Sequence, residues 1–335
     1  MKAYTISKYG KQPLTLSELP IPVPTDTQVL VKINAASVNP IDLKRKHGDL
    51  RTIMATEFPL TLGHDFAGEV IQTGSDVHRF KVGDRVFGKL PDDHIGSFAE
   101  YVTVEAVNIA RIPAELSDVQ AAAIPLVGLT AYQALHNYLN VQPGQRVYIP
   151  AGSGGLGSLA IPIAAVLGAE VTTTASPKSV DRLKALGATT VVDYHQPNFL
   201  TQLGTFDAAF DLRGGQELTA TFDHVKPGGR IVTVNGFPNR AFLKDQGDYY
   251  QLKAPMRFLL KLLSGRLDKK AKQRNIDYRF MLVKSSGAQL AELTDLLTTN
   301  HVLPTIDQTF TFDQTQAALD YVASGHATGK VVITQ

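Results

Sequence analysis

A glycine-rich segment near the middle of the chain has the residue types and spacing of a phosphate-binding turn. It follows the apolar run QRVYIPA, precedes the helical run LGSLAIPIAAVLGA, and satisfies G-x-G-x-x-G from Gly152 to Gly157. Small residues let the backbone approach a pyrophosphate, whose charge is met by free N–H groups at the start of a helix. A turn built of glycines for packing alone is the alternative. We predict a dinucleotide site whose loop contacts are Ser153, Gly154, Gly155, Leu156 and Gly157.

The end of the next strand indicates which dinucleotide binds. An NAD-selecting fold usually offers an acid there to the ribose 2′-hydroxyl, about 20 residues beyond the glycines. This chain has no acid at that place and instead reads Thr174-Ala175-Ser176-Pro177-Lys178. The Ser176 hydroxyl and the Lys178 ammonium, assisted by Arg182, can hold a 2′-phosphate. Lys178 has the alternative of an ordinary solvated loop lysine, but the segment favours NADPH.

Composition restricts the remaining chemistry. The chain has no cysteine, which removes disulfides, thiolate metal ligands and a cysteine nucleophile from consideration. Lys and Arg total 33 against 31 Asp and Glu, and a net charge of +2 gives no argument for a nucleic-acid or membrane partner. The first residues, MKAYTISKYGKQ, contain no apolar signal core, and no apolar run of membrane-spanning length occurs. We therefore expect a cytoplasmic protein.

The distribution of strand and helix signals predicts two domains, as the length of 335 residues also suggests. Residues 1–123 contain short β-like runs separated by turn residues, which indicates a mainly β domain. Residues 124–264 alternate apolar strands with helical periods, which is typical of a parallel, doubly wound sheet. Mixed segments over 265–335 are expected to return and complete the first domain.

Several ordered motifs resemble the medium-chain dehydrogenase/reductase superfamily along nearly the whole chain. The matching segments are Leu62 to Val70 (LGHDFAGEV), Val82 to Val86 (VGDRV), Gly96 to Tyr101 (GSFAEY), Gly128 to Tyr132 (GLTAY), Val141 to Gly144 and Gly329 to Ile333 (GKVVI). This resemblance implies an α/β protein in which a Rossmann-type doubly wound parallel sheet is inserted in a chaperonin-10-like, mainly β catalytic domain.

The same resemblance bears on metal binding. The positions that match the catalytic zinc ligands of the superfamily's alcohol dehydrogenases are Asn39, His64 and Val127. Zinc needs three or four deprotonated protein ligands, so no metal is expected unless an unforeseen site of histidine and carboxylates exists. His64 is then expected to be a hydrogen-bonded structural histidine.

A metal-free hydride-transfer enzyme favours acceptors that are already electrophilic. The resemblance points to the zinc-free quinone oxidoreductase and enone reductase branch, and so to an NADPH-dependent reductase of a small-molecule quinone or α,β-unsaturated carbonyl. Two alternatives stay open: a zinc-type alcohol dehydrogenase, and an NADPH-binding protein without turnover.

The resemblance also suggests catalytic residues. The segment from Ser37 to Asp42 is similar to the N-x-x-D segment that faces the nicotinamide in that branch. Asn39 is the candidate hydrogen-bond donor to cofactor or substrate, and Asp42 is the candidate that orients the segment or relays a proton. Each has a structural alternative: Asn39 as the N-cap before Pro40, and Asp42 as a first-turn helix acid.

Further cofactor contacts are implied by the resemblance. Tyr194 corresponds to a tyrosine near the adenosine phosphates, and Thr130, Asn235 and Gly236 correspond to positions that line the nicotinamide half. The alternatives are a strand-end aromatic that packs on the sheet for Tyr194 and an ordinary turn for Asn235 and Gly236.

Three remaining segments concern assembly and surface. Residues Tyr278 to Val283 resemble the edge strand through which relatives often form homodimers. The apolar run from Phe258 to Leu263 predicts a core-facing helix, with a role at a dimer interface or substrate cleft as the alternative. The basic cluster from Lys269 to Arg274 is expected to be a solvated helix end or loop.

Overall fold

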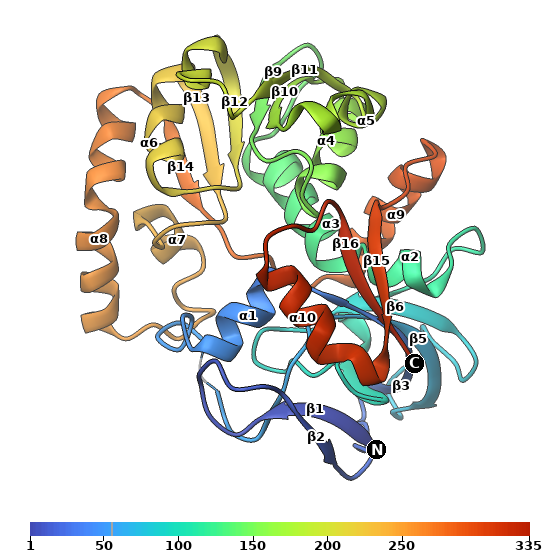
Figure 1. Cartoon of the computed structure of the whole chain (residues 1–335). Helices are drawn as coiled ribbons and strands as arrows, with labels where there is room; N and C mark the ends of the chain where they lie inside the picture. Colours follow the sequence, from blue (N-terminus) through green and yellow to red (C-terminus); the bar gives the residue numbers. More distant parts are fainter. Residues whose placement is uncertain (55) are drawn as a thin grey trace. The chain divides into compact units, whose positions relative to one another are not determined.

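The computed structural model describes residues 1–54 and 56–335 and divides into two compact units (Figure 1). The first unit comprises Met1–Leu129 and Lys284–Gln335, and the second comprises Thr130–Val283. In chain order the second unit therefore interrupts the first. The return to the first unit begins at Lys284, later than the position near residue 265 expected from sequence, because the intervening chain adds one more strand to the second unit's sheet.

Strands make up most of the first unit. Its larger sheet has seven strands in the order β15-β16-β3-β5-β6-β8, with β7 also pairing with β3, and its smaller sheet has the order β2-β1-β4. The strands are β1 (Lys2–Ile6), β2 (Thr15–Glu18), β3 (Gln28–Val38), β4 (Leu60–Thr61), β5 (Asp65–Thr73), β6 (Arg85–Lys89), β7 (Tyr101–Glu105), β8 (Ile109–Arg111), β15 (Ile306–Thr311) and β16 (Lys330–Thr334).

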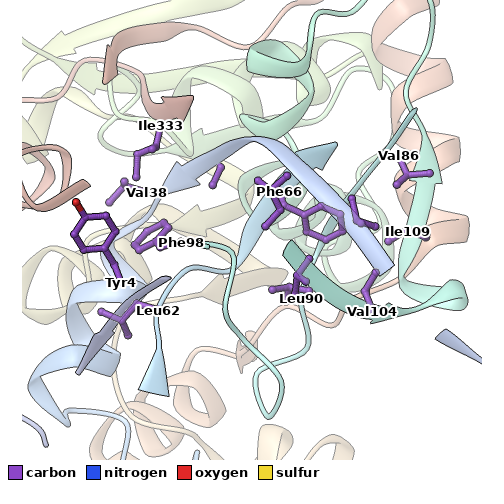
Figure 2. Close-up of a cluster of buried hydrophobic side chains, with 14 of the residues drawn as sticks. Tyr4, Val38, Leu62, Phe66, Val86, Leu90, Phe98, Val104, Ile109 and Ile333 are labelled. Carbon is purple, nitrogen blue, oxygen red and sulfur yellow. The ribbon is translucent and has the colours of Figure 1, made fainter. Parts of the chain in front are cut away.

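One apolar core fixes the register of these strands. Val29, Val31 and Ile33 alternate along β3 and enter this core, because successive side chains of a strand point to opposite faces. Figure 2 shows side chains from several strands meeting there, among them Tyr4, Phe66, Val86, Val104 and Ile333. The last strand of the chain thus packs with the first ones, which completes the unit.

Short helices close the first unit. They are α1 (Pro40–His47), α2 (Asp118–Ala122), α9 (Gly287–Thr299) and α10 (Thr315–Ala323), and the chain passes into the second unit within α3 (Pro125–Tyr132). α1 matters most for the site. Asn39 is its N-cap and Pro40 its first residue, and Gly48 ends it in the left-handed region at φ 85°. The structural role considered for Asn39 is thereby confirmed.

The second unit contains a six-stranded parallel sheet. Its strands are β9 (Arg146–Ile149), β10 (Glu170–Ala175), β11 (Ala188–Asp193), β12 (Phe206–Asp211), β13 (Val225–Thr233) and β14 (Asp277–Phe280), in the order β11-β10-β9-β12-β13-β14. Numbered within the unit, this order is 3-2-1-4-5-6, that of the dinucleotide-binding fold. Such sheets bind ligands beyond the carboxyl ends of their strands, where the strand order reverses. Here that place lies between β9 and β12.

Helices connect these strands. They are α4 (Gly157–Val166), α5 (Val180–Ala185), α6 (Gly215–His224), α7 (Arg240–Asp245) and α8 (Ala254–Gln273), together with a π-helical turn at Gln133–Tyr138 and 3₁₀ turns at Pro177–Ser179 and Phe199–Gln202. All residues of α4 from Gly157 to Ala164 are buried, so this helix packs closely on the sheet directly after the glycine-rich turn.

The helix over the apolar run differs from its expectation. Within α8, at the left of Figure 1, Leu260 is buried, but Phe258 and Leu262 are 64% and 62% exposed, and Leu259 and Leu263 are exposed as well. A helix turns about 100° per residue, so a continuous apolar run cannot face the core throughout. The prediction of a core-facing run is therefore wrong for all but one of its apolar residues.

The basic cluster lies where it was expected, at the carboxyl end of α8 and just beyond it. Lys269, Lys272 and Arg274 are exposed to solvent. Among the described residues, no helix combines the length and the apolar character that crossing a bilayer requires.

Candidate cofactor site and buried polar cluster

The glycine-rich turn leaves the carboxyl end of β9 and leads into α4. The backbone N–H of Gly152 donates to the Thr174 carbonyl oxygen (3.1 Å), which ties the turn to β10. A Cβ on Gly152 would lie 2.3 Å from Thr173 Oγ1, and one on Gly157 would lie 2.5 Å from the Ala151 carbonyl oxygen. Only glycine fits at these two positions. The N–H groups of Ser158, Leu159 and Ala160 in α4 already donate to the carbonyl oxygens of Gly154 and Leu156, so an anion would be met by the N–H groups of the turn from Gly155 to Gly157.

The residues predicted to select the cofactor stand beside this turn. Ser176 follows β10 and is half-buried, while Lys178 lies in the next turn and is exposed. The Arg182 guanidinium of α5 donates through Nη2 to the Ser153 carbonyl oxygen (3.3 Å), so this helix is tied to the glycine-rich turn. Tyr194 follows β11 and is 50% exposed. Its ring stacks on His195, with 4.1 Å between ring centroids.

The strand ends on the other side of β9 form a rigid polar network. Asp211, at the end of β12, accepts hydrogen bonds from Thr233 Oγ1 (2.6 Å) and from the N–H of Gly214 (2.9 Å). Burial raises the pKa of Asp211 to about 6, against the opposing effect of the Thr233 hydrogen bond. Asn235 continues the network, because its Nδ2 donates to the Arg213 carbonyl oxygen (3.0 Å).

The four segments predicted to contact a dinucleotide within this sheet all follow strands at its carboxyl edge. They are the turn from Ser153 to Gly157, the pair Ser176 and Lys178, Tyr194, Asn235 and Gly236. Gly236 has φ 149°, in the region that favours glycine. Thr130, the remaining predicted contact, lies in α3 and is buried. The fold thus brings together residues that are more than 80 positions apart in the chain.

The first unit holds a buried polar cluster around Asn39. The side-chain Nδ2 of Asn39 donates to Asp65 Oδ2 (2.9 Å) and to the Ser37 carbonyl oxygen (3.2 Å), and its Oδ1 accepts a hydrogen bond from the Lys330 ammonium. Asn39 is 1% exposed. Both amide hydrogens are therefore used in this structure, and direct donation to a ligand requires one of these bonds to be exchanged.

Asp42 connects this cluster to His64. Asp42 Oδ2 accepts the backbone N–H of Asn39 (2.8 Å), and its Oδ1 lies 2.6 Å from His64 Nδ1. His64 is fully buried and hydrogen-bonded, as expected of a structural histidine. Its Nε2 has no hydrogen-bond partner and lies 4.0 Å from Asp92 Oδ1, to which Lys89 Nζ is bound at 2.7 Å.

Charges in the cluster are balanced. The carboxylates of Asp42, Asp65 and Asp92 are matched by cations from Lys89, Lys330 and Arg45, all of them buried. Burial raises the pKa of Asp65, and the Lys330 ammonium opposes that shift; burial likewise lowers the pKa of Lys330, and Asp65 and Asp42 oppose it. Asp65 and Lys330 therefore each need the opposite charge of the other in order to stay ionised away from water.

Sequence reasoning missed half of this cluster. Lys330 was seen only as part of the closing GKVVI motif, and the pair of Lys89 and Asp92 was not singled out. Their signal was weak, because a lysine at a strand end is normally solvated. The Lys89 side chain is 1% exposed only because the segment after β6 folds back, where the Leu90 N–H donates to the His64 carbonyl oxygen (2.7 Å).

The donor atoms of the cluster do not suit zinc. Of the three matching positions, Val127 offers no donor atom, the Asn39 amide is fully engaged, and only His64 is of a type that binds zinc. Among the described residues, no three histidine, aspartate or glutamate side chains are grouped to hold a metal ion. The residues present at these positions therefore do not fit a catalytic zinc ion.

A strand order of 3-2-1-4-5-6 with a glycine-rich turn, interrupting a mainly β unit, defines the class of alcohol-dehydrogenase-like proteins. Family models agree: residues 25–114 match the alcohol dehydrogenase GroES-like domain, and residues 186–333 match a family described as zinc-binding dehydrogenase.

Relatives that are similar over the full chain indicate which branch of this class the chain resembles. The mitochondrial NAD(P)H oxidoreductase RTN4IP1 of Danio rerio is 33% identical, over 100% of this chain and 91% of its own length. The 2-methylene-furan-3-one reductase of Solanum lycopersicum is 34% identical, over 99% of this chain and 79% of its own. The solved quinone oxidoreductase of Coxiella burnetii is 34% identical, with a TM-score of 0.86 and coverage of 100% and 99%.

The chain belongs to the medium-chain dehydrogenase/reductase superfamily, in the zinc-free branch that contains the quinone oxidoreductases and enone reductases. The fold class expected from sequence, a Rossmann-type sheet inserted in a chaperonin-10-like domain, is confirmed.

The buried pair of Lys89 and Asp92 is expected to be important for the stability of the first unit. Lys89→Met leaves the Asp92 carboxylate buried without its cation and should lower the free energy of unfolding by about 3–5 kcal/mol. Adding Asp92→Asn should recover part of that loss, because the double variant no longer buries the unpaired carboxylate. Urea denaturation of the single and double variants measures both effects.

Lys226→Met is the matched control, since Lys226 pairs with Asp207 at 2.6 Å but its side chain is 48% exposed. Its loss should stay below about 1 kcal/mol. A loss for Lys89→Met no larger than that of the control would show that the buried pair does not maintain the cluster.

Proposed function

We propose that the chain is an NADPH-dependent reductase that transfers hydride to a quinone or an α,β-unsaturated carbonyl compound without zinc. One observation carries the proposal: a phosphate-binding turn at the carboxyl edge of a dinucleotide fold occurs together with a buried cluster whose donors do not suit a metal. Relatives named quinone oxidoreductase and 2-methylene-furan-3-one reductase support this choice of acceptor.

When bound, the reduced nicotinamide supplies the hydride. The chain's own residues bind the cofactor and orient it. The turn from Gly152 to Gly157 meets the pyrophosphate with backbone N–H groups, and the network of Asp211, Thr233 and Asn235 keeps the far strand ends in place. Without a Lewis acid to polarise the acceptor, a conjugated carbonyl or a quinone is the substrate class that accepts hydride most readily.

Asn39 and Asp42 remain the proposed active-site pair, with a role that the hydrogen bonds make specific. Asp42 holds the N-cap N–H of Asn39 and the ring of His64 at the same time, so it orients the segment from Ser37 to Asp42. Lys330 and Asp65 fix the rotamer of the Asn39 amide from its two ends. Pre-organised hydrogen-bonding groups of this kind position a reactant without reorganisation at the moment of reaction.

Turnover tests the function directly. Purified protein with NADPH and a panel of quinones and enones should consume the cofactor, as followed by the absorbance of the reduced nicotinamide, and simple alcohols with NADP⁺ should not reduce it. Tight cofactor binding without turnover of any acceptor would instead support a non-catalytic NADPH-binding protein. Activity that requires a stoichiometric bound zinc would support an alcohol dehydrogenase.

The residues at the end of β10 are the basis for the proposed preference for NADPH over NADH. That strand ends without an acid and is followed by Ser176 and Lys178, while the only acid in the strand, Glu170, lies at its other end. Selection of NAD through the 2′-hydroxyl would need a carboxylate at the place that these two residues occupy. A hydroxyl and an exposed ammonium there favour the additional phosphate of NADPH.

Lys178→Ala is therefore expected to weaken NADPH binding by about tenfold, since a charge-assisted hydrogen bond of roughly 1.4 kcal/mol is lost. NADH affinity should change less than about twofold. Lys184→Ala is the matched control, because Lys184 is an exposed lysine in the neighbouring α5. Isothermal titration with both nucleotides measures the ratio, and equal weakening of NADPH and NADH by Lys178→Ala would contradict the assignment.

We further propose that the chain forms a homodimer through the second unit. β14 is the outermost strand of the parallel sheet and pairs in this structure with β13 only on one side. An open strand edge can extend a sheet into a second copy. Helix α8 contacts β14 and carries the exposed apolar side chains of Phe258, Leu259, Leu262 and Leu263. A patch of this kind next to an open edge is typical of an interface.

Leu262→Asp places a charge in this patch and is expected to weaken dimerisation by about tenfold or more. Sedimentation velocity across a concentration series measures the change. Val107→Asp, at a residue of the first unit that is 67% exposed, is the control and should leave the dimer unchanged. A monomeric wild-type chain, or a Leu262→Asp dimer as tight as the wild type, would refute the proposed interface.

A further inference from the structure

A histidine stands at the strand end beside the proposed 2′-phosphate residues. β10 and β11 run parallel, with Ala175 opposite Asp193 as their last pair. Adjacent strands lie about 4.8 Å apart. Ser176, Lys178, Tyr194 and His195 therefore leave the same edge of the sheet from neighbouring strands.

Asp193 fixes the ring of His195. Its Oδ1 accepts the backbone N–H of His195 (3.0 Å) and lies 2.8 Å from the ring nitrogen Nδ1. The ring also stacks on Tyr194, at an interplanar angle of 29°. With Nδ1 occupied by the carboxylate, Nε2 is the nitrogen left to bind a ligand, and the His195 side chain is 55% exposed. The imidazole is thus both oriented and accessible.

The same contacts engage the Asp193 carboxylate with local donors. It accepts the backbone N–H of His195, lies against the His195 ring and accepts a further hydrogen bond from Gln196. These hydrogen bonds hold the pKa of Asp193 below its usual value. The carboxylate therefore stays ionised and holds the Nδ1 edge of the imidazole, which leaves Nε2 for a ligand.

We propose that His195 is a further specificity-determining residue, whose Nε2 contacts the 2′-phosphate of NADPH. The inference rests on the proposed preference for NADPH and adds a third side chain to Ser176 and Lys178. Lys178 and Arg182 bring cations from the β10 side, and His195 brings its Nε2 from the β11 side, so the phosphate is held between two strand ends.

Calorimetry with four nucleotides tests the inference. Wild type, His195→Ala and His195→Gln are titrated with NADPH, NADH, 2′,5′-ADP and 5′-AMP. His195→Ala should weaken NADPH and 2′,5′-ADP by roughly five- to tenfold, as expected for loss of one partly exposed hydrogen bond to a charged group. NADH and 5′-AMP should change less than about twofold. His195→Gln, which keeps a neutral donor, should fall between wild type and His195→Ala for the phosphorylated ligands.

His224→Ala is the matched control, because His224 is an exposed histidine of the same unit whose Nδ1 bonds to the Gly204 carbonyl oxygen. It should leave all four affinities unchanged. Thermal unfolding of each variant checks that the sheet is intact.

The outcomes separate the inference from the function on which it rests. A wild type that binds NADPH and NADH equally would refute the NADPH preference and the role of His195 together. A wild type that prefers NADPH, loses that preference with Lys178→Ala and keeps it with His195→Ala would refute His195 alone. Equal weakening of all four ligands by His195→Ala would show that the imidazole supports the adenosine half and does not bind the phosphate.

Discussion

The close approach of α4 to the ends of β9 and β10 is the constraint on which the cofactor site depends. At Gly152 a Cβ would lie 2.3 Å from Thr173 Oγ1, and at Gly157 a Cβ would lie 2.5 Å from the Ala151 carbonyl oxygen. Any side chain at either position would push the helix away from the sheet and displace the N–H groups of the turn that would meet a pyrophosphate. The neighbouring strand ends then add their side chains at fixed spacing, because parallel pairing sets their register.

The first unit depends on a different constraint, because its buried charges must be paired with opposite charges. In a zinc enzyme of this superfamily a metal would organise this region; here the buried ion pairs Lys89–Asp92 and Lys330–Asp65 connect it. A buried charge whose partner is removed is costly, whereas a matched set is tolerated. The geometry of the segment around Asn39 therefore depends on distant residues, most clearly on Lys330, which lies 291 positions away in the chain.

Much of the fold could be predicted from the sequence, because the patterns that indicate it lie within short segments of the chain. G-x-G-x-x-G between an apolar strand and a helix is typical of a dinucleotide-binding turn. The Asn39-Pro40 pair predicted the start of α1. Two features escaped prediction because burial is a tertiary property. The run from Phe258 to Leu263 looked like core, yet nothing in its own composition says which face of α8 packs on the sheet. Lys89 looked solvated, and only the folded segment after β6 buries it.

The polar cluster around Asn39 and the polar residues at the ends of β10 and β11 differ in where their hydrogen bonds lie. Around Asn39 every hydrogen bond is internal, so the cluster shapes the active-site segment without exposing donors of its own. At the ends of β10 and β11 the reverse holds, because Lys178 and His195 are exposed and one nitrogen of His195 faces outward. Tight internal pairing suits a region that must position a reacting group, while exposed donors suit a region that must capture a charged ligand from water. This contrast explains why sequence motifs could point to the proposed cofactor residues by type, whereas the roles proposed for Asn39 and Asp42 became specific only through their hydrogen-bond partners.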